Sequence, residues 1–203
     1  MNTPWHDVFV SEGTFGLLDN GDIPVHSADW SNGLIAPMLQ GGALVRTGIQ
    51  TGYVRVCART EREPTEDIDE SRPWEEIVEA TVTAPHNLLR LESLDFGPPA
   101  PGTLLTTADC FQYRVRVHAL GRDVAQSNTT PVPPEEYLLL AWPSEPAPTH
   151  TLRTSSRLEE EEQAEAANPH PPRLAPDEPS EATAEREIRA QLDDALRRSR
   201  KKQ

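Results

Sequence analysis

The stretch FQYRVRVHALGRD, residues 111–123, decides the fold class of this 203-residue chain. Its apolar residues occur at every second position: Phe111, Tyr113, Val115, Val117 and Ala119. The positions between them are polar: Gln112, Arg114, Arg116 and His118. Successive side chains of a β-strand point to opposite faces, so this pattern predicts a half-buried strand with its polar face in water.

Short apolar or alternating stretches separated by turn-forming segments recur at residues 5–11, 14–18, 33–36, 43–48, 53–60, 74–84, 88–95 and 135–143. Residues 74–84, WEEIVEATVTA, also fit the 3.6-residue period of a helix, but Val, Ile and Thr favour a strand. The apolar run in residues 135–143 indicates a strand buried on both faces. We therefore predict an all-β fold, an antiparallel β-sandwich of about eight strands.

The composition changes after Trp142. Residues 147–179 are rich in proline and glutamate and have no periodic apolar positions, which predicts a disordered linker between a folded domain, residues 1–146, and a tail. Residues 180–203 fit an amphipathic helix that forms on contact with a partner, with Ser180 as its N-cap. The residues expected to carry recognition by this tail are Ile188, Leu192, Leu196, Arg197 and Arg198.

The net charge of −14 argues against nucleic-acid binding by the folded body, because phosphate contacts need a cationic surface. A basic protein partner is favoured instead. The most concentrated anionic segment of the folded body is EREPTEDIDESRP, residues 61–73, which we call the acidic loop. We expect its carboxylates to attract a basic surface such as the substrate groove of a nuclease or toxin. These residues are Glu61, Glu63, Glu66, Asp67, Asp69 and Glu70.

No motif in the chain predicts catalysis, a metal ion or a cofactor. Nucleophile-elbow and phosphate-binding loop patterns are absent, and the six histidines never stand at metal-ligand spacing. The segment ADWSNG, residues 28–33, resembles the start of a calcium loop but lacks its later glutamate, which favours a turn. Cys57 and Cys110 do not form a metal or disulfide motif. We therefore expect a protein that is not an enzyme.

The polar row Arg114, Arg116 and His118 has a structural explanation. Glu75 and Glu79 lie on one face of another expected strand, and Arg55 and Arg59 lie on a third. If these strands are neighbours, charge pairs across them account for the whole set. We favour this explanation over a working cationic site.

The sequence predicts no transmembrane segment. No apolar run approaches the roughly 18 residues that span a bilayer, and the start MNTPWHDVFV lacks the features of a signal peptide. These features favour a cytoplasmic protein.

Only Lys201 and Lys202 among the 19 basic residues are lysine, which is typical of high-GC bacterial genomes. The segments TGYVRVCAR, WEEIVEA, FQYRVRVHALGRD and EEYLLLAWP resemble a group of small uncharacterised β-rich proteins from such bacteria. Over residues 43–143 the order of elements is similar to that of competence protein J, the inhibitor of a competence-associated nuclease. The resemblance implies a non-catalytic sandwich that binds a protein, and it carries over no inhibitory residue.

Three functions follow from these observations. The first is an acidic, non-catalytic module that inhibits a nuclease or toxin or provides immunity to it. The second is a regulatory or scaffold protein recognised through its C-terminal helix. The third is a small-ligand-binding sandwich, which predicts a concave aromatic patch. We expect the four tryptophans to lie mostly in the core, so the first two functions are preferred.

Overall fold

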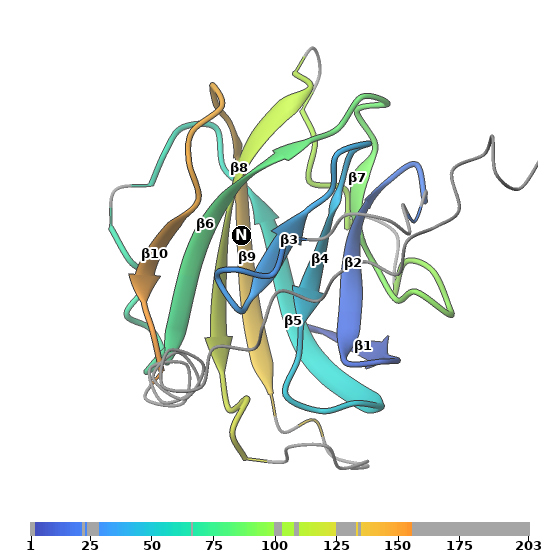
Figure 1. The fold of residues 1–203 in the computed structure, drawn as a ribbon, viewed down its shortest axis with the longest axis vertical. Coiled ribbons are helices and arrows are strands. Elements are labelled where there is room, and N and C mark those ends of the chain that lie inside the picture. Colours follow the sequence, from blue (N-terminus) through green and yellow to red (C-terminus); the bar gives the residue numbers. More distant parts are fainter. Residues whose placement is uncertain are drawn as a thin grey trace, which may run out of the picture. The chain divides into compact units, whose positions relative to one another are not determined.

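The computed structural model describes residues 3–21, 23, 29–65, 67–99, 103–107, 110–124, 133 and 135–155. All regular secondary structure in these ranges is β, with ten strands in two sheets (Figure 1). The predicted all-β class is therefore confirmed. No helix in the described ranges is long and apolar enough to cross a membrane.

The larger sheet has six strands in the order β1-β5-β9-β8-β6-β10. Its strands are β1 (His6–Val10), β5 (Gly52–Thr60), β6 (Glu76–Thr83), β8 (Gln112–Leu120), β9 (Glu136–Pro143) and β10 (His150–Arg153). Neighbouring strands are antiparallel except β5 and β9, which run parallel. The expectation of a purely antiparallel fold is wrong at this pair. A parallel pair needs a long crossover, and three strands lie between β5 and β9 in the sequence.

The smaller sheet has four antiparallel strands in the order β3-β4-β2-β7. Its strands are β2 (Thr14–Asp19), β3 (Ile35–Pro37), β4 (Ala43–Arg46) and β7 (Leu89–Glu92). At the turn after β2, Asn20 and Gly21 have φ values of 63° and 76°. An Asn-Gly pair adopts this left-handed conformation readily, which suits a tight turn between strands.

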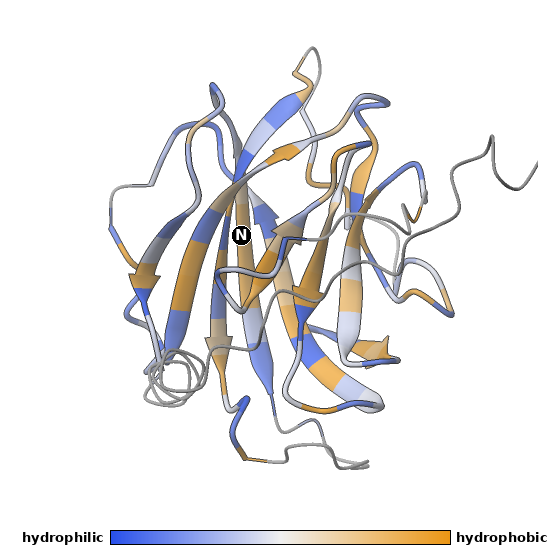
Figure 2. Cartoon of the chain, in the orientation of Figure 1, coloured by the Kyte–Doolittle hydropathy of each residue, from blue (hydrophilic) through white to orange (hydrophobic). Residues whose placement is uncertain are grey.

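The two sheets share one hydrophobic core, in keeping with the predicted sandwich. Val115 and Val117 of β8 and Leu139 of β9 belong to the same buried cluster as Phe15 and Leu17 of β2. Hydrophilic residues interrupt the hydrophobic ones along β6, as Figure 2 shows, and its core residues Val78, Ala80 and Val82 stand at every second position, on one face of the sheet. The face of the larger sheet that points away from the core is called the outer face below.

The central strand β8 corrects two details of the predicted pattern. Phe111 precedes the strand and is 59% exposed, so it does not join Tyr113 and Val115 in the core. The polar face of β8 is not in water, because Arg114 and Arg116 are buried. The strands predicted at residues 74–84 and 135–143 are both present as strands, and β9 is buried on both faces as expected.

The last strand, β10, lies in the segment predicted to be linker. It pairs antiparallel with β6 and forms an edge of the larger sheet. The first residues of the expected linker, up to Ser155, are therefore described as part of the folded body. The predicted helix at residues 180–203 lies outside the described residues.

Candidate functional site

The outer face of the larger sheet gathers the polar residues that drew attention in the sequence. Strand register places one residue of each strand β5, β9, β8 and β6 in a common row: Arg59, Leu140, Arg116 and Glu79. The adjacent row consists of Cys57, Leu138, His118 and Ile77. Residues far apart in the sequence thus become neighbours because strands β5, β9, β8 and β6 lie side by side in that order.

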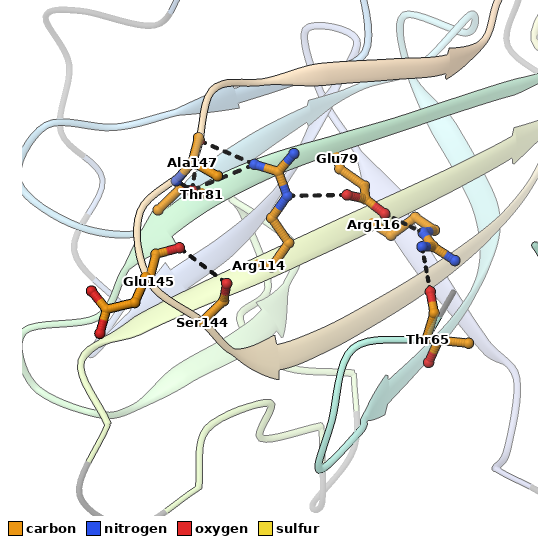
Figure 3. Close-up of polar contacts among 8 residues, drawn as sticks. All are labelled: Thr65, Glu79, Thr81, Arg114, Arg116, Ser144, Glu145 and Ala147. Atoms are coloured by element: carbon orange, nitrogen blue, oxygen red, sulfur yellow. Dashed lines mark hydrogen bonds and ion pairs between the residues drawn. The ribbon is translucent and has the colours of Figure 1, made fainter. Parts of the chain in front are cut away.

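Glu79 binds both arginines of β8. Its carboxylate accepts hydrogen bonds from Nε of Arg116 at 2.6 Å and from Nε of Arg114 at 3.1 Å. Figure 3 shows the carboxylate between the two guanidinium groups. The side chains of Arg114, Arg116 and Glu79 are 8%, 5% and 13% exposed, respectively. The predicted cross-strand pairing is confirmed for Glu79, and this pairing is buried.

Arg116 also holds the acidic loop. Its two terminal nitrogens donate to the backbone carbonyls of Asp67 at 2.9 Å and Thr65 at 2.5 Å. Its guanidinium lies over the ring of Trp142, 5.4 Å from the centroid, where a cation–π contact is favourable. A single side chain thus connects strand β6, strand β9 and the loop.

Arg114 holds the segment that follows β9. It donates to the carbonyl of Ala147 at 3.1 Å, and the hydroxyl of Thr81 also bonds to the Ala147 backbone (Figure 3). The segment therefore covers the end of β8 on the outer face. These two covering segments explain why the polar face of β8 is buried.

The described carboxylates of the acidic loop differ in exposure, and Glu61 and Asp69 are half-buried. Asp69 pairs with Arg59 at 3.2 Å and caps the backbone of Ser71, and these contacts outweigh burial and lower its pKa. Glu63, Asp67 and Glu70 are exposed. Glu70 contacts Arg153 at 3.2 Å, but it remains 67% exposed, so the contact contributes little. The loop is bound to the sheet through its backbone, and three of its five described carboxylates face solvent.

The remaining predicted charge partners differ from expectation. Glu75 accepts a hydrogen bond from the backbone of Gly121 at 2.8 Å and binds no arginine of β8. Arg55 pairs with Glu136 of β9, since β9 and not β6 is its neighbour. The strand order, which the sequence does not reveal, decides these partners.

His118 is fully buried on the outer face, against the ring of Trp74. Its Nδ1 lies 3.3 Å from the carbonyl of Leu138, which can only accept, so Nδ1 carries the proton and Nε2 is bare. Burial, with a smaller effect of Arg116, lowers the pKa of His118 to about 4. The imidazole is therefore neutral at neutral pH.

Cys57 and His118 do not form a nucleophilic pair. They share a row of the sheet, but Leu138 of β9 stands between them, so their Cα atoms are roughly 10 Å apart at the usual strand spacing. Burial raises the pKa of the Cys57 thiol, which keeps it protonated. The arrangement lacks the contact through which a histidine activates a thiol.

A second polar cluster lies at the end of the core between the sheets. Arg122 donates to the carboxylate of Glu76 and, at 3.2 Å, to the carbonyl of Gly33. Ser155 donates to the same carboxylate at 2.9 Å. Glu76 stands two positions before Val78 on β6, so strand alternation indicates that its side chain points into the core. Arg122 lies after the end of β8, where no alternation indicates its direction.

Glu135 completes this buried cluster. It accepts hydrogen bonds from the backbone N–H groups of Gly48 at 3.0 Å and Ile49 at 2.6 Å, and from the hydroxyl of Tyr137. Burial raises the pKa of Glu135 although these donors oppose the shift. The cluster joins the loop after β4 to the start of β9 and satisfies most of its groups internally, so we assign it a structural role.

The other predicted site residues have no structural counterpart here. Glu66 and the tail residues Ile188, Leu192, Leu196, Arg197 and Arg198 lie outside the described residues. In ADWSNG the Asp29 carboxylate accepts from the backbone of Ser31 at 2.9 Å, which forms the expected turn. No group of residues that could hold a metal ion occurs in the part of the chain that the structure describes.

No protein-family model, curated protein or solved structure matches the chain. The resemblance to competence protein J therefore remains a prediction.

Proposed function

We propose that this protein is a non-catalytic module that binds a basic partner protein through the acidic loop. One observation carries the proposal. Arg116 fastens the loop to the outer face by its backbone carbonyls and leaves Glu63, Asp67 and Glu70 exposed. A loop whose backbone is held at Thr65 and Asp67 loses less conformational entropy on binding than a free loop does.

The charge distribution supports a basic partner. The chain carries a net charge of −14, and the loop concentrates carboxylates on one surface. Complementary charge speeds the encounter of two proteins and selects against acidic or neutral competitors. Nuclease active sites bind phosphate through cationic grooves, so a nuclease or toxin is the partner class that this surface fits best.

The test is capture from a lysate of the source organism with the full chain, followed by identification of the partner and binding kinetics with the purified pair. The triple variant Glu63→Gln, Asp67→Asn, Glu70→Gln removes the exposed loop charges. We expect it to slow association about tenfold or more at low salt. The matched control is Glu12→Gln, Asp95→Asn, Glu145→Gln, which removes three exposed carboxylates outside the loop. We expect this control to bind almost normally.

Two results contradict the proposal. In the first, the loop and control variants slow association equally, which shows that the association rate depends on the net charge of the protein and not on the acidic loop. In the second, Ile188→Glu with Leu192→Glu in the full chain abolishes binding while the loop variant retains it. That result assigns recognition to the predicted C-terminal helix and makes the protein a regulatory or scaffold protein.

A further inference from the structure

A pocket of about 530 Å³ opens on the outer face of the larger sheet, and the end of the acidic loop, from Asp69 to Pro73, forms part of its wall. Its volume is within the range of small-molecule sites, roughly 300–1,000 Å³. Cys57 and Leu138 line it from strands β5 and β9, and Trp74 lines it from the segment before β6. The exposed carboxylates Glu63, Asp67 and Glu70, which carry the proposed partner surface, do not line it.

The charged groups of the pocket favour a single negative charge. Arg59, Arg72 and Asp69 line it, so two guanidinium groups face one carboxylate in a protein that is otherwise strongly acidic. The Arg59 and Arg72 side chains are 36% and 35% exposed, which leaves them within reach of a ligand. Each binds one carboxylate, Asp69 or Glu136, and a guanidinium has five N–H donors.

The pocket also contains polar atoms that lack partners. Trp74 is 2% exposed, and its indole Nε1 has no hydrogen-bond partner in the structure. The Nε of Arg59 is likewise buried and unpartnered. Unpaired buried donors are rare because they are costly, and both of these belong to the lining of one pocket. Both are N–H groups, so the missing partner is a hydrogen-bond acceptor.

Apolar side chains form the rest of the wall. Trp5, Pro73 and Leu138 line the pocket together with the Trp74 ring. Trp5 is half-buried, and the guanidinium of Arg72 lies over its ring at 4.7 Å, which fixes the orientation of both. A flat apolar group fits against such a surface while its charged end meets the arginines.

We propose that this pocket binds a small monocarboxylate with an aromatic or similarly flat apolar body. The carboxylate accepts hydrogen bonds first from the outer N–H groups of Arg59 and Arg72. A small rotation of the buried side chains then brings the Trp74 indole N–H and the Arg59 Nε–H to the same acceptor. The apolar body lies against Trp5 and Leu138.

The chain's four tryptophans allow a direct test by ¹H–¹⁵N correlation spectra of the indole groups in the full-length protein. Substituting each tryptophan by phenylalanine assigns the four signals. The probes are benzoate, phenylacetate and indole-3-acetate, each compared with its neutral amide. We expect saturable shifts of the Trp5 and Trp74 signals with the acids and about tenfold weaker binding of the amides. Trp30 and Trp142 do not line the pocket and serve as internal references.

Matched variants separate a specific site from general attraction. Arg59→Gln is expected to weaken carboxylate binding about tenfold or more. Arg90→Gln is the control, because Arg90 lies on β7 of the smaller sheet and pairs with Glu92. If Arg59→Gln disturbs the fold, Ser71→Phe blocks the pocket from an exposed lining position and is expected to abolish the Trp5 and Trp74 shifts.

The proposal is overturned if millimolar carboxylates leave the Trp5 and Trp74 signals unmoved. That result is expected if the Trp74 indole N–H donates to Nε2 of His118 in solution and not to a ligand. It is also overturned if the amides bind equally well, or if Arg59→Gln and Arg90→Gln behave alike. None of these results affects the acidic-loop proposal, whose test changes carboxylates outside the pocket.

Discussion

Nε of Arg116 on β8 donates to the carboxylate of Glu79 on β6 at 2.6 Å, and the same guanidinium holds two carbonyls of the acidic loop. One buried ion pair therefore sets the position of a surface loop. The arginine row that drew attention in the sequence is an internal connection and not an exposed cationic site.

Glu79→Gln is expected to destabilise the protein by about 3–5 kcal/mol, because it leaves two buried guanidinium groups without a counter-charge. Glu70→Gln, the matched change at an exposed ion pair, is expected to cost less than about 1 kcal/mol. Urea unfolding of both variants measures the difference. Equal losses contradict the conclusion that the Glu79 pair is buried and structural.

Arg116→Met is expected to release the acidic loop, because it removes both side-chain donors to the backbone of Thr65 and Asp67. A glutamate-specific protease should then cut the loop about tenfold faster than in the wild type, since cleavage follows local opening. Arg114→Met is the control, because Arg114 binds Ala147 and not the loop. If both variants are cut at the same rate, the role of Arg116 in positioning the loop is wrong.

Gly48→Ala is expected to destabilise the protein by about 3 kcal/mol or more, because an added Cβ would lie 1.9 Å from the backbone oxygen of Arg122. A backbone atom cannot relieve this clash by changing rotamer, as a flexible side chain can. Gly97→Ala meets no atom within 4 Å, and only its φ of 73° adds strain, about 1–2 kcal/mol. Thermal unfolding ranks the two variants. A smaller loss at Gly48 contradicts the close approach of these two loops.

The buried His118 makes stability depend on pH. Its pKa is about 4 in the folded protein and 6.5 in an unfolded chain, so between these values the unfolded state binds more protons. The contribution of His118 to the free energy of unfolding is therefore constant above pH 6.5. Below that pH it falls by about 1.4 kcal/mol per pH unit until the pH reaches about 4. The nearby charges Arg116 and Arg59 add to the shift, and Asp69 opposes it.

His118→Phe isolates this contribution from other groups that titrate in acid. We expect the stability difference between variant and wild type to be constant above pH 6.5 and to change in favour of the variant below it. Unfolding in urea at a series of pH values measures that difference. A difference independent of pH between 4 and 6.5 shows that the histidine is not held neutral by burial.

Local patterns predicted the strands well. The alternation around Val115 and Val117 identifies β8, and the apolar run in residues 135–143 identifies β9. β10 escaped prediction because it has only four residues, HTLR, and follows a proline-rich segment. Its pairing with β6 defines it as a strand more than its own composition does.

The candidate sites were harder to predict because they combine residues from distant segments. The carboxylates of the acidic loop stand out as a charge run in one short segment. The pocket could not be found, since Trp5, Cys57 and Trp74 come from three separate segments and meet only in the folded sheet. The buried cluster of Glu76 and Arg122 escaped for the same reason.

By itself, the sequence determined the β-strand periodicity, the all-β class and the acidic character of the molecule, because these follow from side-chain type and spacing along the chain. Only the tertiary structure decided the strand order, and with it the partners of each charge. Arg114 and Arg116 are buried because the acidic loop and the segment after β9 fold across their strand. Burial depends on what covers a face, and here the covering segments lie far from β8 in the sequence.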